Sequence, residues 1–200
     1  MKRFGTAAIL AGGKSTRMGF DKQLLKINDR LIYQNVFESL TDIFSDIAVV
    51  TNTPNLYEAS ELRVCSDEFL NMGPLSGIHI SLKTAQSEYV YLLACDMPIV
   101  NPRFVSHMMR RVIETGAEIC VTKRNGKIEP FNAFYKAELV TNLEARLQSG
   151  NTSLYDFITS SNVCVISEEE AQRFDSNLDM YINLNTQGDY HNYLKKVSGK

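Results

Sequence analysis

Short apolar runs alternate along the chain with segments whose apolar residues recur at helical spacing. Ile32, Val36, Leu40 and Phe44 follow that spacing and predict an amphipathic helix over 32–43. Apolar runs predict strands over 6–10, 47–51, 62–65, 89–95, 118–122, 163–166 and 181–184. Further helices are predicted from Gly73 to residue 82 and over 103–114, 137–148, 153–159 and 187–196.

The order of these elements predicts the fold class. Repeated strand–helix units favour a mostly parallel sheet with helices on both faces. The run 89–95 is almost wholly apolar, as expected for a central strand buried on both sides. We therefore expect an α/β protein, a three-layer α/β/α sandwich with a Rossmann-like sheet, in which residues 1–200 form a single domain. An irregular insertion is expected at about 123–160, beginning with a hairpin turn at Asn125 and Gly126.

The turn after the first predicted strand has the composition of a phosphate-binding loop. Gly12 and Gly13 let the backbone turn sharply and present its N–H groups to a ligand. Lys14, Arg17 and Lys22 add positive charge close by. Peptide donors combined with Arg and Lys suit a polyanion, most simply a nucleoside triphosphate. The alternative is a tight strand-to-helix turn with solvated charges.

Two common nucleotide motifs do not fit this loop. A Walker A loop needs a glycine where the chain has Ala8. The Gly-x-Gly-x-x-Gly pattern of dinucleotide-binding folds does not occur here either.

Polar residues also follow the other predicted strands. In parallel sheets, ligands bind at the carboxyl ends of the strands, so Asn52, Asp67 and Asp96 are expected near the glycine loop. Asp96 follows seven apolar or small residues, and a carboxylate there suits Mg²⁺ bound together with substrate phosphates. Its alternative role is to cap the turn before Pro98. Asp67 either accepts a hydrogen bond from a base or ribose, or is a turn residue.

Composition narrows the class of function. The net charge is −2 and the basic residues form no long run, which argues against a nucleic-acid groove or a membrane-binding patch. The four cysteines lack Cys-x-x-Cys spacing, and the three histidines lie far apart, so neither set predicts a metal site. Free thiols and the lack of a secretory leader indicate a cytoplasmic protein.

Several motifs together resemble a known family. Residues 10–13, 17–19 and 21–22 look like the opening of nucleotidyltransferases of the sugar-nucleotide type. The Arg-Met-Gly-x-Asp-Lys version is similar to the molybdenum cofactor guanylyltransferase family, also called the MobA family. The motifs at 73–77, 95–98 and 183–186 occur in the same order as in that family, so the resemblance spans nearly the whole chain.

The resemblance implies an activity and roles for particular residues. It implies Mg²⁺-dependent transfer of GMP from GTP to molybdenum cofactor, a molybdopterin, with release of pyrophosphate and without a general base. Arg17, Lys22 and Asp96 would be catalytic, and Asp96 would hold Mg²⁺. Either Asn183 or Asn185 would bind the pterin acceptor or the metal. The residues implied to bind the nucleotide are Leu10, Ala11, Gly12, Gly13, Lys22, Asp67 and Asp96.

The chain departs from the family pattern at two points, and other functions stay open. Asp29 and Arg30 stand where the family often has Gly-x-Pro-Leu, and Gln187 stands where a proline commonly follows Asn-Thr. A related transferase could use CTP, on a pterin or on a sugar or alditol phosphate. A nucleotide-binding regulator without turnover and a plain interaction protein are further alternatives. The family also implies transient contact with cofactor-insertion and acceptor proteins.

Overall fold

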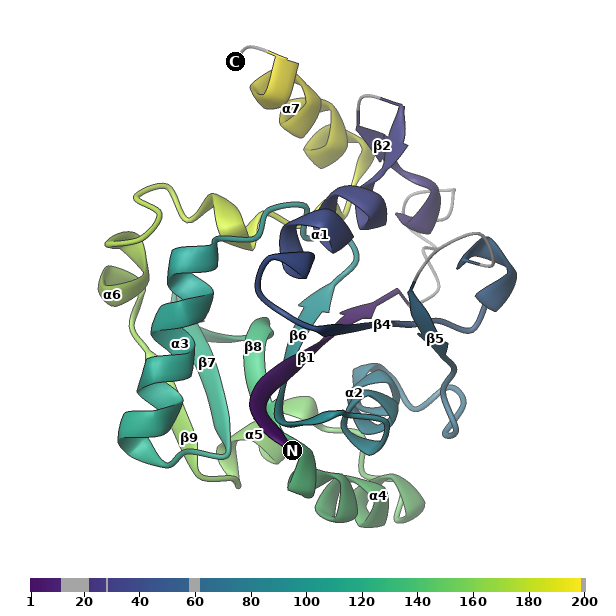
Figure 1. Cartoon of the computed structure of the whole chain (residues 1–200), viewed down its shortest axis with the longest axis vertical. Coiled ribbons are helices and arrows are strands. Elements are labelled where there is room, and N and C mark those ends of the chain that lie inside the picture. The colour runs from purple at the N-terminus through teal and green to yellow at the C-terminus, as the bar shows by residue number, and fades with distance from the viewer. Residues whose placement is uncertain (12–21, 28, 58–61, 199–200) are drawn as a thin grey trace.

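The computed structural model describes residues 1–11, 22–27, 29–57 and 62–198 (Figure 1). Its main sheet has seven strands in the order β5-β4-β1-β6-β8-β7-β9. Only β8 is antiparallel to its neighbours. The strands are β1 (Lys2–Leu10), β4 (Asp46–Val50), β5 (Arg63–Cys65), β6 (Ser87–Ala94), β7 (Ile119–Arg124), β8 (Lys127–Lys136) and β9 (Val163–Ile166). The mostly parallel sheet predicted from the sequence is confirmed.

Seven α-helices among the described residues connect and cover the strands. They are α1 (Ile32–Thr41), α2 (Pro74–Lys83), α3 (Pro102–Thr115), α4 (Val140–Gln148), α5 (Leu154–Thr159), α6 (Glu168–Gln172) and α7 (Gln187–Ser198). The 3₁₀ helices are η1 (Lys22–Leu24), η2 (Pro54–Tyr57), η3 (Ala137–Leu139) and η4 (Asp179–Tyr181). A separate two-stranded sheet pairs β2 (Lys26–Ile27) with β3 (Arg30–Leu31). Figure 1 shows α7 beside β2, close to the C-terminus.

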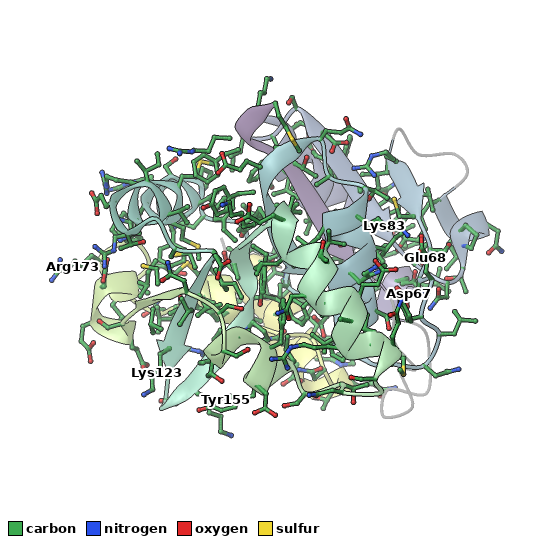
Figure 2. The ribbon with its side chains drawn as sticks, turned by 90° about the horizontal axis from the view of Figure 1, so that it is seen from below. Asp67, Glu68, Lys83, Lys123, Tyr155 and Arg173 are labelled. Carbon is green, nitrogen blue, oxygen red and sulfur yellow. The ribbon has the colours of Figure 1, made fainter. Side chains whose placement is uncertain are left out.

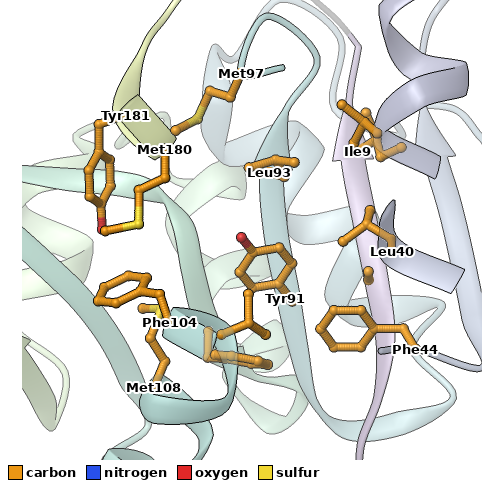
Figure 3. Close-up of a cluster of buried hydrophobic side chains, with 14 of the residues drawn as sticks. Ile9, Leu40, Phe44, Tyr91, Leu93, Met97, Phe104, Met108, Met180 and Tyr181 are labelled. Atoms are coloured by element: carbon orange, nitrogen blue, oxygen red, sulfur yellow. The ribbon is translucent and has the colours of Figure 1, made fainter. Parts of the chain in front are cut away.

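Alternating residues of the strands form two hydrophobic cores. In β6, Tyr91 and Leu93 face a core that also contains side chains of α1 and α3. Val90 and Leu92 face the other core, which contains side chains of α2, α4 and α5. Figure 3 shows part of the first core, where the Tyr91 ring stacks on Phe44 at a centroid distance of 5.4 Å. The three-layer arrangement follows from this strand alternation.

The predicted irregular insertion is wrong in its main feature. The segment 123–160 contains β8, a ten-residue strand that pairs with both β6 and β7. The hairpin turn at Asn125 and Gly126 is present, and both residues have positive φ angles of 49° and 76°. The predicted helices at 137–148 and 153–159 correspond to η3 with α4 and to α5.

The strand predicted over 181–184 is also wrong. Residues 179–181 form η4, and Leu184 donates a backbone hydrogen bond to Asp96 O (2.9 Å) instead of joining a sheet. Buried side chains explain the apolar pattern there: Tyr181 and Leu184 are 1% and 0% exposed. Tyr181 also donates from its hydroxyl to Thr122 Oγ1 (2.6 Å).

The cysteines are all free thiols, and two of them are fully enclosed in the core. Cys120 and Cys164 are neighbours in the register of β7 and β9. Within the described ranges, the helices are too short or too polar to cross a membrane.

Asn132 holds β8 in a strained but well-bonded conformation. Its φ is 56° and its side chain is buried. Asn132 Oδ1 accepts from the Tyr91 hydroxyl (2.5 Å), and Nδ2 donates to Met180 O (3.4 Å). Positive φ is rare for residues with a side chain, so these contacts must outweigh the backbone strain.

We expect Asn132→Ala to lower the free energy of unfolding by about 2–4 kcal/mol, because it leaves the Tyr91 hydroxyl unpaired and keeps the strain. Asn132→Gly should cost about 1 kcal/mol less, since glycine tolerates positive φ. Denaturant unfolding measures both values. Asn125, which has positive φ but is exposed, provides the control: its Ala and Gly variants should differ by the strain alone. Equal stabilities of Asn132→Ala and Asn132→Gly would contradict a role for strain.

Candidate active site

The carboxyl ends of four parallel strands lie in one row. Successive neighbours at these ends are Cys65 of β5, Val50 of β4, Leu10 of β1 and Ala94 of β6. The pattern continues past the strand ends, where Thr51 N donates to Cys65 O (2.9 Å). The residues that follow these strands therefore share one edge of the sheet, as the sequence predicts.

Leu10 and Ala11 form the middle of this edge. Ala11 N donates to Val50 O (2.8 Å), and Leu10 O accepts from Cys95 N (3.0 Å). Their side chains are almost fully buried, at 9% and 2% exposure.

The described residues include only the end of the predicted phosphate-binding loop. Lys22 is the first residue of η1. The next residue, Gln23, accepts a hydrogen bond at Oε1 from Thr51 Oγ1 (2.9 Å), so the chain leaves the loop beside the end of β4. The remaining predicted loop residues lie outside the described part of the chain: Gly12, Gly13, Lys14 and Arg17.

Asp67 follows β5 and is oriented by Asn52, which follows β4. Asn52 Nδ2 donates to Asp67 Oδ2 (3.0 Å), and Asp67 N donates to Asn52 Oδ1 (3.3 Å). The other carboxylate oxygen, Oδ1, is buried and has no hydrogen-bond partner among the residues that the structure describes. Buried acceptors normally have a partner, so this oxygen is suited to a donor on a ligand.

Asn52 is the residue in this pair that the sequence did not single out. It was recognised only as a polar residue at the end of a strand. Its partner lies 15 residues away in the sequence, and the pairing depends on the adjacency of β4 and β5.

Gly77 allows α2 to pack closely behind Asp67. A Cβ atom at this position would lie 3.3 Å from Leu10 Cδ2 and 4.0 Å from Asp67 Oδ1. A side chain would therefore press on Leu10, which lines the edge of the sheet. The glycine brings the first turns of the helix close to the buried carboxylate oxygen.

Burial raises the pKa of the Asp67 carboxyl above its ordinary value of 3.8, although the hydrogen bond from Asn52 opposes this shift. Two neighbours on the same side of the sheet, Glu68 and Lys83, form an exposed ion pair of 2.6 Å (Figure 2). That pair is screened by solvent and adds little to stability. In contrast to this exposed pair, the Asp67 carboxylate has a buried oxygen that lacks a partner among the described residues.

Asp96 lies at the end of β6 and is 9% exposed. Its carbonyl accepts from Leu184 N (2.9 Å), which places Asn183 and Asn185 next to it in the chain that crosses the site. Asn183 Nδ2 donates to Tyr181 O (3.0 Å), so its amide group is oriented. The structure thus brings the segment 183–185 to Asp96, although 87 residues separate Asp96 from Asn183 in the sequence.

Asp96, Asn183 and Asn185 carry side-chain oxygens of the kind that a hard cation prefers. Mg²⁺ commonly uses few protein ligands together with substrate phosphates. Over the described residues, no group of three or more His, Cys, Asp or Glu side chains could hold a metal by itself. The described side chains therefore do not form a metal site on their own.

Comparison with known proteins agrees with this geometry. The model of the MobA-like NTP transferase domain matches residues 7–165. The chain belongs to this family. A relative in Syntrophotalea carbinolica named molybdenum cofactor guanylyltransferase is 44% identical over 98% of the chain and 94% of its own length. A relative in Peptoclostridium acidaminophilum, named a probable molybdenum cofactor guanylyltransferase, is 41% identical over 96% and 89%.

A solved structure with little sequence identity has the same fold. Molybdopterin-guanine dinucleotide biosynthesis protein A from Archaeoglobus fulgidus superposes with a TM-score of 0.86. The match covers 98% of this chain and 100% of the other, at 23% identity. The α/β architecture therefore persists where most of the sequence has changed.

The raised pKa of Asp67 predicts a pH-dependent effect of Asp67→Asn. Because the folded protein binds this proton more tightly than the unfolded chain, ionisation of Asp67 destabilises the fold as the pH rises above about 4. Asp67→Asn removes that charge and should be more stable than the wild type at pH 7, with the difference shrinking towards pH 4. Urea unfolding at both pH values measures this. A stability difference that is the same at both pH values would contradict the assignment.

Proposed function

We propose that the protein transfers the GMP part of GTP to the phosphate of molybdenum cofactor and releases pyrophosphate. The observation that carries this proposal is the pair of carboxylates, Asp67 and Asp96, at the ends of β5 and β6 on one edge. Three strand spacings separate them, or about 14 Å. That span suits a nucleotide whose base lies at Asp67 and whose phosphates lie at Asp96. The names of the relatives at 41–44% identity support guanine and molybdenum cofactor as the substrates.

Asp67 is the proposed contact for the base. A guanine base carries two neighbouring N–H donor groups on one edge, and Asp67 Oδ1 is a buried acceptor with no partner within the described part of the chain. The hydrogen bonds between Asn52 and Asp67 fix the direction in which this oxygen points. A base that donates to Oδ1 would compensate for its burial, so binding and selectivity would come from the same atom.

The proposed reaction needs positive charge and positioning more than proton transfer. An oxygen of the acceptor phosphate attacks the α-phosphorus of GTP, and the bond from that phosphorus to the β-phosphate oxygen breaks. The acceptor phosphate is already an anion, so a general base is not required. Arg17 and Lys22 are proposed to neutralise the charge that develops on pyrophosphate.

Asp96 is proposed to organise the reacting end of the nucleotide. We propose that it holds Mg²⁺, with Asn183 or Asn185 contacting either the metal or the pterin acceptor. When bound, the metal would polarise the phosphate oxygens and reduce repulsion between the two anionic reactants. The low exposure of Asp96 excludes much competing water from this end of the site. We also propose that the protein acts in the cytoplasm, since its four thiols are free.

A panel of nucleotides tests the substrate. The protein is mixed with GTP, CTP, UTP or ATP and Mg²⁺, and the melting temperature is measured. We expect GTP to raise it most, because only guanine offers paired donors to Asp67 Oδ1. A larger shift with CTP would assign the protein to a cytidylyl transferase instead. The absence of a shift with all four would contradict nucleotide binding.

Asp96→Asn tests the reacting end of the site. We expect it to lower the rate of pyrophosphate release in the presence of GTP and molybdenum cofactor by at least about 100-fold, because the charge that holds the metal is lost. Unfolding curves establish that the variant is folded. Asp156→Asn, an exposed position on α5, is the matched control and should keep full activity. Turnover by Asp96→Asn at the wild-type rate would refute the role. A wild type that binds GTP but releases no pyrophosphate would be a regulator.

A further inference from the structure

Gln23 joins the end of the predicted phosphate-binding loop to the carboxyl end of β4. Its Oε1 atom accepts hydrogen bonds from Thr51 Oγ1 (2.9 Å) and from the Tyr57 hydroxyl (3.0 Å). Its Nε2 atom donates to Thr53 Oγ1 (3.1 Å). One amide group thus bonds to three side chains from a segment about 30 residues away. We call Gln23, Thr51, Thr53 and Tyr57 the Gln23 cluster.

Two hydroxyl groups of this cluster, those of Thr51 and Tyr57, donate to Gln23 from buried positions. Thr51 and Tyr57 are each 1% exposed. A buried hydroxyl that loses its acceptor costs more than the hydrogen bond itself contributes, because water cannot replace the acceptor. Tyr57 is also held by its ring, which packs on Tyr33 at a centroid distance of 4.7 Å. The partners of Gln23 are therefore fixed in place and in turn fix Gln23.

Thr51 connects the cluster to the side of the site that holds Asp67. Its backbone N–H donates to Cys65 O (2.9 Å), and its carbonyl accepts from Ser66 Oγ (2.9 Å). The residue after Thr51 is Asn52, which orients Asp67. A continuous set of bonds thus runs from Gln23, across the end of β4, to the carboxylate proposed to bind the base.

The chain beyond Gln23 is anchored as well. Leu25 O accepts from Ile32 N (2.9 Å), at the start of α1. Lys26 O accepts from the Tyr190 hydroxyl of α7. With these anchors, the backbone immediately after Lys22 is held from three directions.

We propose that Gln23 is a positioning residue that fixes the backbone at Lys22 relative to Asp67, so that the triphosphate and the base bind together. The inference rests on the proposed nucleotide site. Without the cluster, the backbone of residues 22–23 would have to become ordered when the phosphates bind. The conformational entropy lost in this step would weaken nucleotide binding. The loss of affinity on replacing Gln23 should therefore grow with the number of phosphates on the ligand.

Gln23→Met removes the amide and keeps the shape of the side chain. Its affinity for GTP, GDP and GMP is compared with that of the wild type by calorimetry. We expect GTP binding to weaken about 10-fold, GDP binding less, and GMP binding by less than about 2-fold. A merely structural role would weaken all three equally. Equal losses, or no loss, would overturn the proposal.

Tyr57→Phe and Thr51→Val each remove one donor to the same Oε1 atom and provide milder variants if Gln23→Met unfolds. Each should weaken binding of GTP more than that of GDP, and that of GDP more than that of GMP, but by less than Gln23→Met does. The double variant Gln23→Met, Thr51→Val should bind GTP about as well as Gln23→Met alone, because the two residues act through one bond. Fully additive losses would contradict the coupling.

Gln34→Met is the matched control. Gln34 lies nearby at the start of α1, where its Oε1 accepts from Leu31 N (3.0 Å). It lies outside the Gln23 cluster, so this variant should bind GTP like the wild type. If the wild type instead prefers CTP, the proposed substrate fails, and CTP, CDP and CMP then provide the same test of Gln23.

Discussion

The register of four parallel strands is the constraint on which the rest of the site depends. β5, β4, β1 and β6 end at the same level, so short segments that are distant in sequence become neighbours. Each strand then needs only one or two polar residues after its end. A shift of one residue in any strand would turn its side chains to the other core and move its polar residue off the edge.

The two aspartates at this edge of the sheet, Asp67 and Asp96, are held in place by different contacts. Asp67 is held by Asn52 through two hydrogen bonds, and its other carboxylate oxygen has no partner among residues 1–11, 22–27, 29–57 and 62–198. Asp96 lies where the chain crosses back over the sheet, and the segment 183–185 is bonded to its carbonyl. The Asp67 carboxylate is thus oriented by the residue after a neighbouring strand, whereas the backbone of Asp96 is held by a late segment of the chain. Both arrangements reduce the reorganisation needed when a ligand binds.

Local sequence patterns were enough to predict most helices and strands and two of the candidate site residues. Apolar spacing located α1, α3 and the parallel strands, and polar residues after strands pointed to Asp67 and Asp96. β8 was missed because a strand with Pro130 and partly exposed residues at its start has a weak local pattern, and its pairing with β6 is long-range. The segment 181–184 was predicted as a strand because its apolar residues are buried, but they are buried without joining a sheet. The Gln23 cluster and the Asn52 bonds depend on contacts that span 15 to 34 residues, which spacing alone does not reveal.

The contact between Tyr190 and Lys26 has a consequence for synthesis of the protein. Lys26 is translated early, but its partner on α7 is added 164 residues later. The crossing of residues 183–185 over Asp96 is likewise completed late. During translation, the sheet can pair from β1 to β6 well before these last contacts exist. The nascent chain would therefore pair these strands first, and complete the first core and the site only when residues 178–193 have emerged from the ribosome.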